Sequence, residues 1–270
     1  MWVMPRANRH HIPGQVWHIT HRCHKREFLF KFSRDRKCWI QWLFEAKKRY
    51  GLSILNFMVT SNHIHLLVVD GESDAISRSI QLIAGSSAQE FNRRKGRKGA
   101  YWEDRYHATA IERGEHLLRC LVYIDMNMVR AGAVSHPSEW LHCGYHEIQQ
   151  QPSRYRLINR ECLIDLCGMQ SDQQLVAQHR DWIKQEVQGN VLKRETKWSE
   201  SVAVGTTGFI ERFQQQLGIQ AAGRKVREAG DAYVLREPEI VYQAHFEAEK
   251  GCLSMDNGVY FDENAEESIC

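Results

Sequence analysis

Two histidines stand two positions apart in residues 61–69 (S-N-H-I-H-L-L-V-V), and this run constrains the fold more than any other feature of the chain. Side chains alternate between the faces of a β-strand, so His63 and His65 share one face while Ile64 and Leu66 share the other. The run therefore predicts a strand that presents two imidazoles side by side. Such a pair could bind a divalent metal ion, which would need at least one more ligand from elsewhere in the chain.

The segments around this run alternate between strand and helix patterns. Predicted strands cover residues 15–21, 52–59, 63–69 and 101–111, and predicted helices cover residues 33–50, 74–92 and 115–129. Gly51 and Gly132 follow two of these helices and are predicted to cap them. The short connection at residues 60–62 makes the second and third strands a hairpin. This order predicts an α+β fold, with a ferredoxin-like antiparallel sheet and helices on one face.

The length of 270 residues is more than one average domain needs. We expect a nuclease-like domain at residues 1–146, a mainly helical extension at 147–235, and an acidic, weakly ordered tail at 236–270. The predicted helices of the extension cover residues 160–167, 172–187 and 206–217.

The net charge of +3 conceals an asymmetry between the two parts of the chain. Residues 1–146 hold 22 Lys and Arg against 13 Asp and Glu, a balance of +9, whereas residues 147–270 hold 14 against 20, a balance of −6. The first part is suited to binding phosphate, although a basic surface that only faces solvent would have the same composition. We hypothesise that the acidic tail folds back over the basic part and limits nonspecific DNA binding.

No run approaches the length of a membrane span, and the first residues lack the apolar block of a signal peptide, so we expect a cytoplasmic, nucleoid-associated protein with no membrane contact. The eight cysteines include no C-x-x-C spacing. They are predicted to be buried free thiols and not disulfides or zinc ligands.

The third metal ligand is predicted in the helix at residues 115–129. Residues four apart share a helix face, so Arg119, Tyr123 and Asn127 form one stripe opposite the apolar positions. If this helix lies over the hairpin, Tyr123 and Asn127 face the two histidines.

This set of residues would support transesterification of a DNA phosphodiester. His63, His65 and Asn127 would hold Mg²⁺ or Mn²⁺, and Tyr123 would attack phosphorus, keep the 5′ side as a phosphotyrosine and release a 3′-OH. The ordinary pKa of a phenol is about 10, so the metal ion or a cation such as Arg119 would have to assist.

Three segments together resemble a known family: S-N-H-I-H-L-L-V, Y-W-E-D-R-Y-H-A-T-A-I-E and L-V-Y-I-D-M-N-M-V-R-A-G-A-V. Over residues 14–146 the chain resembles the single-tyrosine transposases of the His-hydrophobic-His class, especially the group associated with repetitive extragenic palindromes. The resemblance implies the same metal pair, nucleophile and third ligand, and a substrate of single-stranded DNA with a hairpin. Many relatives have Asn-Pro-Val-Arg after the tyrosine, whereas this chain has Met128 after Asn127.

DNA contacts are predicted at basic residues outside the metal site. They are Arg93, Arg94, Lys95, Arg97, Lys98, Arg105 and Arg119. The run at residues 93–98 is expected to be an unpacked loop, and a solvated loop without DNA contact is its alternative.

The same residues are consistent with two other functions. One is a rolling-circle replication initiator or relaxase, which shares two histidines and a tyrosine. The other is a non-catalytic ferredoxin-like regulator that binds DNA or RNA hairpins. The protein is expected to be a monomer or a homodimer.

Overall fold

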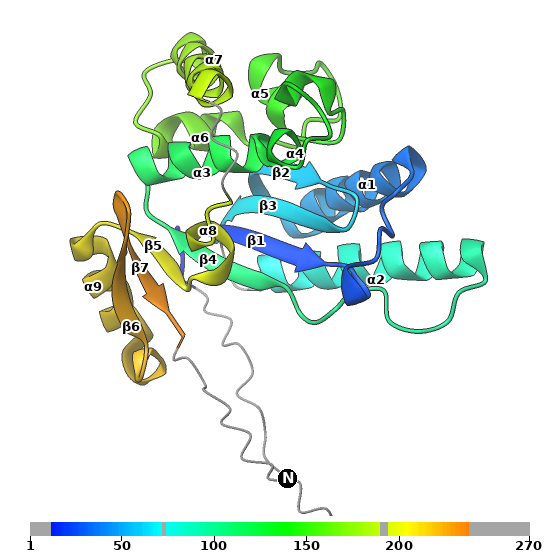
Figure 1. Cartoon of the computed structure of the whole chain (residues 1–270), viewed down its shortest axis with the longest axis horizontal. Helices are drawn as coiled ribbons and strands as arrows, with labels where there is room; N and C mark the ends of the chain where they lie inside the picture. The colour runs from blue at the N-terminus through cyan, green and yellow to red at the C-terminus, as the bar shows by residue number, and fades with distance from the viewer. Residues whose placement is uncertain (1–11, 72–73, 190–193, 238–270) are drawn as a thin grey trace, which may run out of the picture. The chain divides into compact units, whose positions relative to one another are not determined.

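The structure is a computed structural model that describes residues 12–71, 74–189 and 194–237 (Figure 1). The predicted acidic tail lies outside the described residues, except for Arg236 and Glu237. Within the described ranges, no helix combines the length and apolar character that crossing a membrane requires.

The described residues form a seven-stranded sheet with the strand order β2-β3-β1-β4-β5-β7-β6. Its strands are β1 (Val16–Arg22), β2 (Ser53–Val59), β3 (His63–Val69), β4 (His107–Ile111), β5 (Ala203–Gly205), β6 (Lys225–Ala229) and β7 (Ala232–Arg236). Neighbouring strands are antiparallel except for β4 and β5, which are parallel. The predicted hairpin of β2 and β3 is confirmed, and it forms one end of the sheet.

Helices connect and flank these strands. They are α1 (Ser33–Tyr50), α2 (Ala75–Lys95), α3 (Glu115–Asp125), α4 (Asn127–Arg130), α5 (Tyr145–Gln149), α6 (Arg160–Leu166), α7 (Asp172–Gly189), α8 (Lys197–Glu200) and α9 (Thr207–Leu217). Short 3₁₀ turns are η1 (His24–Arg26), η2 (Pro137–Glu139) and η3 (Gly218–Ala221). Gly51 ends α1 as predicted, with a left-handed φ of 66° and its N–H donating to the Lys47 carbonyl.

Two predicted elements are shorter than the sequence pattern indicated. The strand predicted at residues 101–111 begins only at His107, because the charged residues 103–105 form a bend. The helix predicted at residues 115–129 is interrupted at Met126, whose ψ of −2° ends α3 before α4 begins. The interruption leaves Asn127 at the first position of a new helical turn.

The α+β class with a mainly antiparallel sheet is confirmed, and helices cover the second face of the sheet as well as the first. On one face of the sheet, Ile19, Ile64 and Leu66 pack in a core with residues of α1 and α2. On the other face, Val16 and Leu67 pack in a second core with residues of α3, α6 and α7. The strands carry apolar side chains on both sides, so both faces must be covered.

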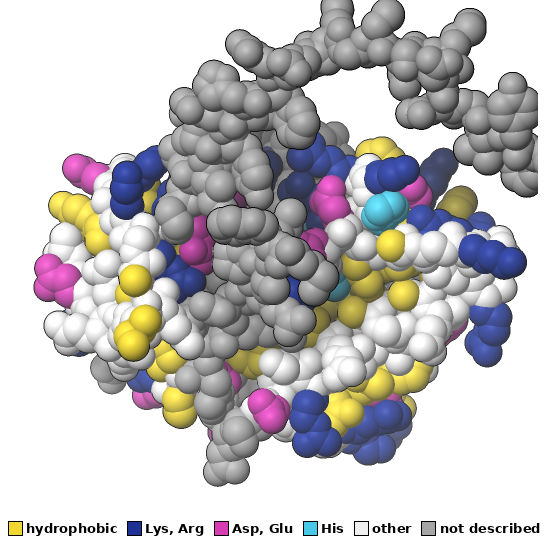
Figure 2. Space-filling view, turned by 90° about the horizontal axis from the view of Figure 1, so that it is seen from below, with side chains coloured by type: hydrophobic (Ala, Val, Ile, Leu, Met, Phe, Trp, Pro, Cys, Tyr) yellow, Lys and Arg dark blue, Asp and Glu magenta, His cyan; other side chains and the backbone are white. Residues whose placement is uncertain are grey.

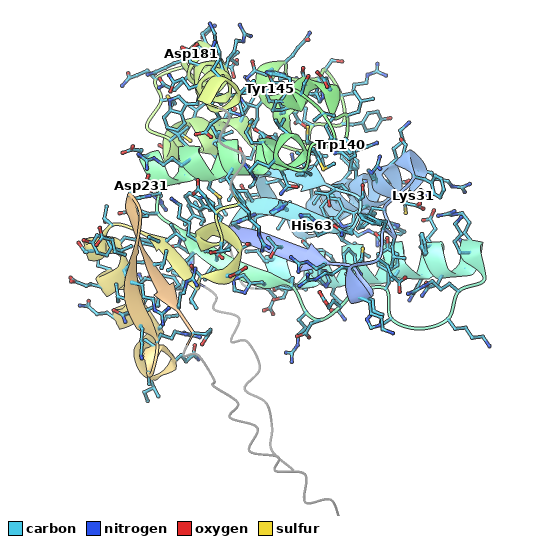
Figure 3. The ribbon with its side chains drawn as sticks, viewed as in Figure 1. Lys31, His63, Trp140, Tyr145, Asp181 and Asp231 are labelled. Carbon is cyan, nitrogen blue, oxygen red and sulfur yellow. The ribbon has the colours of Figure 1, made fainter. Side chains whose placement is uncertain are left out.

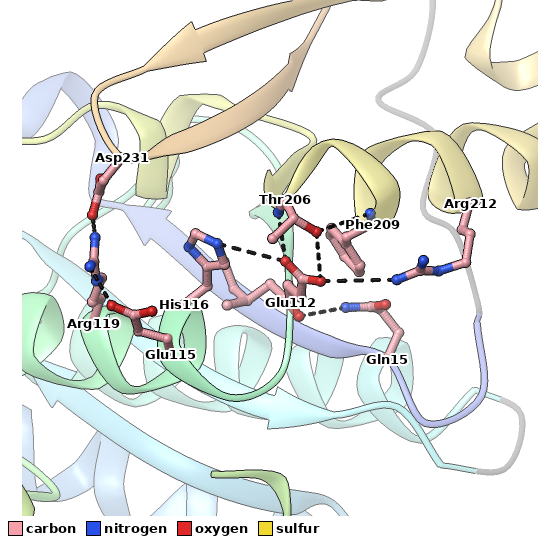
Figure 4. A network of polar contacts seen from close by, with 10 residues as sticks. Gln15, Glu112, Glu115, His116, Arg119, Thr206, Phe209, Arg212 and Asp231 are labelled. Atoms are coloured by element: carbon pink, nitrogen blue, oxygen red, sulfur yellow. Dashed lines mark hydrogen bonds and ion pairs between the residues drawn. The ribbon is translucent and has the colours of Figure 1, made fainter. Parts of the chain in front are cut away.

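The C-terminal region extends the same sheet. The predicted helices α6, α7 and α9 are confirmed, but the strand patterns of β5, β6 and β7 were missed. β5 pairs with β4, and the Glu112 carboxylate next to β4 accepts hydrogen bonds from the Thr206 N–H and hydroxyl at 2.6 and 3.0 Å (Figure 4). The division predicted at residue 146 stays a prediction, while described residues on both sides of it share one sheet.

The six cysteines within the described residues are free thiols, as predicted. They are Cys23, Cys38, Cys120, Cys143, Cys162 and Cys167. Cys252 and Cys270 lie outside the described residues.

Candidate active site

Polar side chains are concentrated on the face of the sheet that packs against α3. In the register of the strands, Thr20 lies opposite His65 on one side and opposite His107 on the other. Residues that pair directly across antiparallel strands point to the same face, so His65 and His107 lie on one surface. His18 follows on the same face of β1, two positions from Thr20. His63 stands at the start of β3 (Figure 3).

The predicted metal-binding pair converges in the structure. The Nε2 atoms of His63 and His65 lie 3.1 Å apart, and the Asn127 side-chain amide nitrogen lies 2.9 Å from Nε2 of His65. Asn127 reaches this position from the start of α4, and His65 is only 2% exposed. The structure therefore brings together the three residues that the sequence proposed as ligands.

Both imidazoles of the pair are neutral near pH 7. Burial lowers the pKa of His63 to about 4, and burial lowers the pKa of His65 well below its usual value. The Nδ1 atom of His63 lies 2.8 Å from Oδ1 of Asn62, whose amide nitrogen in turn donates to the Arg26 carbonyl. His63 therefore carries its proton on Nδ1 and leaves Nε2 as a lone pair.

The donor set fits a divalent ion. Two cis ligands at about 2.1 Å from one octahedral ion are about 3 Å apart, close to the separation of these two nitrogens. In the described part of the chain, no three His, Cys, Asp or Glu side chains form a metal-binding group, so the third ligand must be of another kind. The Asn127 amide supplies an oxygen by a 180° rotation, since its two ends are nearly equivalent in shape. Of the two predicted ions, Mn²⁺ tolerates imidazole better than Mg²⁺.

Tyr123 lies next to this group on α3. Its ring centroid is 6.0 Å from that of His65 and 6.1 Å from that of His18, and its side chain is 6% exposed. Burial raises the pKa of Tyr123, an effect opposed by the charges of Arg130 and Arg194 and by a hydrogen bond with Ser199. The phenol is therefore protonated near pH 7 and needs its cationic neighbours to ionise.

Tyr123, His63, His65 and Asn127 line one open cavity of about 880 Å³. Five arginines line it as well: Arg22, Arg26, Arg105, Arg130 and Arg194. The described residues place no salt bridge on Arg22, Arg26, Arg105 or Arg130, whereas Arg194 pairs with Glu200. Four carboxylates, of Glu103, Asp104, Glu200 and Glu237, line the cavity too, so the arginines outnumber them by one. The arginines without a salt bridge are suited to binding a phosphodiester.

The end of the helix that carries Tyr123 packs against the C-terminal region of the chain. Asp125, at its end, is fully buried and accepts hydrogen bonds from Nε2 of His179 at 2.7 Å and from the Asn56 amide at 3.1 Å. His179 belongs to α7, so the C-terminal region covers this side of α3. The Asp125 carboxylate therefore has its partners within the protein.

Arg119 does not point into the cavity with the histidines. It forms ion pairs with Glu115 and Asp231 (Figure 4) and lines a separate cavity of about 420 Å³, which also borders Tyr123. The cation that contacts the Tyr123 ring is Arg130, whose guanidinium carbon is 4.2 Å from the ring centroid. Sequence reasoning missed Arg130, although its position seven residues after Tyr123 places both on one helix face.

The basic run at residues 93–98 lies apart from the cavity, at the end of α2. Lys and Arg side chains gather toward the right of Figure 2, the side on which α2 ends in Figure 1. The run is not wholly an unpacked loop as predicted, because its first three residues complete α2 and Arg94 and Arg97 pair with Asp35 and Glu27. Arg93, Lys95 and Lys98 are exposed.

Residues 194–200 contribute to the site from outside the motifs. α8 lies over β1 and β4 (Figure 1), and the Trp198 ring is 6.1 Å from the Tyr123 ring. Arg194 and Ser199 line the same cavity as Tyr123. No sequence signal pointed to these residues, because their positions depend on a chain segment that returns to the sheet after α7.

Comparison with known proteins supports the resemblance stated above. Residues 13–127 match the family model described as "Transposase IS200 like". No curated protein matches the chain at a significant level.

Two solved structures are similar to parts of the chain. One, a REP-associated tyrosine transposase bound to a REP hairpin, has 23% identity and a TM-score of 0.45, and the match covers 53% of this chain and 84% of that one. The other, a candidate transposase from Deinococcus radiodurans R1, has 16% identity and a TM-score of 0.31, with 38% and 83% covered.

Proposed function

We propose that this protein is a metal-dependent single-strand DNA endonuclease and strand transferase that cleaves hairpin-associated DNA through a 5′-phosphotyrosine. The observation that carries the proposal is the convergence of Tyr123 with His63, His65 and Asn127 on one arginine-lined cavity. A tyrosine, two neutral imidazoles and several arginines form a set of groups that can support phosphotyrosine chemistry.

In the proposed reaction, the Tyr123 oxygen attacks phosphorus and the bond from phosphorus to the 3′-oxygen breaks. The 5′ phosphate remains on the tyrosine, the phenol proton passes to solvent in the cavity, and the released 3′-oxygen takes up a proton. Strand transfer is the reverse step with a different 3′-OH as nucleophile. Because the phosphotyrosine preserves a phosphodiester bond, rejoining needs no ATP.

Different residues of the chain have different roles in this proposed step. Arg130 contacts the Tyr123 ring and favours the phenolate, and Arg22, Arg26 and Arg105 bind phosphate oxygens. His63, His65 and Asn127 would hold Mn²⁺ or Mg²⁺, which supplies a positive charge that stabilises the transferring phosphate.

The exposed basic residues at the end of α2 provide the DNA contact outside the cavity in this proposal. Lys95 lies 5.2 Å from the ring of Phe32, a side chain that is 54% exposed. An exposed aromatic ring beside lysines suits an unpaired base with its phosphate. The hairpin DNA itself is inferred from the resemblance of residues 14–146 to the transposases associated with repetitive extragenic palindromes.

The proposal is tested by capturing the covalent adduct. A hairpin oligonucleotide with a single-stranded flank, labelled on its 3′ side, is incubated with protein and Mn²⁺ and resolved on a denaturing gel. Tyr123→Phe is expected to abolish the adduct while hairpin affinity stays within about twofold, because only one hydroxyl is removed. Tyr101→Phe is the matched control, since Tyr101 is also buried but packs in the core with α1 and α2.

The results separate the proposal from its rivals. An adduct that persists in Tyr123→Phe removes Tyr123 from the mechanism. Hairpin binding by the wild-type protein without any adduct favours a non-catalytic regulator, and unchanged cleavage in EDTA excludes the metal ion.

A further inference from the structure

His18 connects the proposed metal site to the C-terminal region through both of its ring nitrogens. Its Nε2 atom is 2.9 Å from Nδ1 of His65, and its Nδ1 atom is 2.7 Å from the backbone carbonyl oxygen of Trp198. The side chain is fully buried, and its ring stacks on that of His65 with centroids 5.1 Å apart. Every polar atom of this imidazole therefore has a partner.

These contacts determine where the protons lie. A carbonyl oxygen only accepts hydrogen bonds, so Nδ1 of His18 must carry a proton that it donates to Trp198. A neutral imidazole has one N–H, which leaves Nε2 of His18 as an acceptor. The proton between the two rings then belongs to Nδ1 of His65.

This arrangement leaves the lone pair of His65 on Nε2, the atom that faces His63 and Asn127. Without a partner for Nδ1, the ring could carry its proton on Nε2 and donate it to Asn127 or His63. That tautomer cannot bind a metal ion through Nε2. A metal-binding histidine commonly donates its other N–H to a carboxylate or carbonyl, and here a second histidine stands between the ligand and the carbonyl.

We propose that His18 is a positioning residue. Because its Nδ1 donates to the Trp198 carbonyl, its Nε2 must accept from Nδ1 of His65, and Nε2 of His65 therefore stays free to bind metal. This inference rests on the metal site of the proposed function. It also gives α8 a defined part in that site: the segment must dock on β1 for the ligand to hold the correct tautomer.

No acidic side chain takes the place of His18. Within the described residues, polar atoms of His18, His63 and Asn127 lie within 3.1 Å of the His65 ring nitrogens, and no salt bridge reaches His18 or His65. The centroid of the Tyr123 ring lies 6.1 Å from that of His18, and the phenol does not compete for Nε2 of His18. The tautomer of His65 therefore depends on His18.

Two substitutions test the two contacts of His18 separately. In His18→Asn, the amide nitrogen occupies the place of Nδ1, so the contact with Trp198 is retained and the one with His65 is lost. In His18→Gln, the longer side chain reaches His65 and its oxygen accepts from Nδ1 of His65. Cooperative thermal unfolding of both variants verifies that each one folds.

The first measurement needs no metal ion. Two-dimensional NMR of the ¹⁵N-labelled histidines in the full-length protein reports which ring nitrogen carries the proton. We expect His65 to be protonated on Nδ1 in the wild-type protein and in His18→Gln, and to change to Nε2 in His18→Asn. A wild-type His65 protonated on Nε2 overturns the inference, whatever the variants do.

The second measurement is the affinity for Mn²⁺ by isothermal titration calorimetry. His18→Asn should bind about 10–100-fold more weakly than the wild type, and His18→Gln within about threefold of it, as for other outer partners of metal ligands. Equal Mn²⁺ affinity in the wild type and His18→Asn overturns the positioning role of His18 but not the proposed metal site. A wild-type protein that binds no Mn²⁺ removes the proposed metal site and this inference together.

Discussion

The two faces of the sheet are built from alternate residues of the same strands, yet one face is apolar and the other carries buried polar groups. The face covered by α1 and α2 carries Ile19, Ile64 and Leu66, all buried and apolar. The face covered by α3 carries His18 and His65, which are equally buried but polar. The first face stabilises the fold, while the second holds polar groups whose burial costs free energy unless each one has a partner.

The difference shows how a site can be rigid in a small domain. Burial of the apolar face fixes the positions of β1 and β3. The polar side chains on the opposite face of the same strands are therefore also held in fixed positions. Hydrogen bonds from His65 to His18 and from Asn127 to His65 then satisfy polar groups inside the protein. Neighbouring residues of β3 can therefore be changed to separate stability from chemistry.

The largest expected contrast is between His65→Ala and Leu66→Ala, adjacent residues on opposite faces. His65→Ala should weaken Mn²⁺ binding by more than about 100-fold, because even the loss of an outer partner of a ligand costs about 10–100-fold. Leu66→Ala should instead lower the free energy of unfolding by about 2–5 kcal/mol and leave the Mn²⁺ affinity of the folded protein unchanged.

Calorimetric titration with Mn²⁺ and urea unfolding measure the two effects on the same samples. If Leu66→Ala, under conditions where it is folded, loses as much Mn²⁺ affinity as His65→Ala, the two faces of the sheet do not have separate roles in stability and metal binding.

A smaller effect is expected at Arg130, whose charge lowers the pKa of Tyr123 against the effect of burial. Arg130→Gln should raise the pKa of Tyr123, so that less phenolate exists at any given pH and the rise of cleavage rate with pH moves to higher pH. If the pKa of Tyr123 rises by about 1, cleavage at a fixed pH below the pKa should become about tenfold slower, because the phenolate fraction falls tenfold.

Single-turnover cleavage rates measured from pH 6 to 10 test this expectation. Arg119→Gln is the control, because Arg119 is held by Glu115 and Asp231 in the neighbouring cavity and should leave the pH profile unchanged. If Arg119→Gln shifts the profile and Arg130→Gln does not, the assignment of the assisting cation is wrong.

The smallest expected effect is on DNA affinity at the exposed end of α2, a helix of the apolar face. The double variant Lys95→Gln, Lys98→Gln should bind the hairpin oligonucleotide more weakly, and the slope of log K against log salt should fall by about 1.4, since each phosphate contact on a single strand contributes about 0.7. Cleavage at saturating DNA should not change, because neither lysine lines the cavity.

Fluorescence anisotropy between 50 and 300 mM salt measures the slope. The control is Lys184→Gln, Lys225→Gln, which removes two exposed lysines from α7 and β6. Equal slopes in the two double variants would assign the DNA contact to another surface.

Much of the fold was predictable from local patterns. The β2–β3 hairpin followed from the alternation of residues 52–69, and the end of α1 followed from Gly51, which adopts the left-handed conformation that glycine favours. The sharing of one face by Tyr123 and Asn127, and of another by His63 and His65, was predictable from the helix and strand periods. These inferences needed no knowledge of distant contacts.

The features that were missed all depend on segments distant in sequence. The covering of α3 follows from packing against α7, where Asp125 meets His179. The assignment of Arg119 failed because Asp231, from the β6–β7 turn, pairs with it. A helical pattern identifies which residues share a face, but not which partner will cover that face.

Spacing within a few residues was enough to identify the strand with His63 and His65, the helix with Tyr123, and the resemblance to single-tyrosine transposases. Only the tertiary structure decided that His18 lies between His65 and the Trp198 carbonyl, and that Arg130, not Arg119, is the cation beside the tyrosine. The physical reason is that a buried polar atom takes whatever partner the folded chain brings within hydrogen-bond distance, and that partner is some 180 residues away in the case of His18.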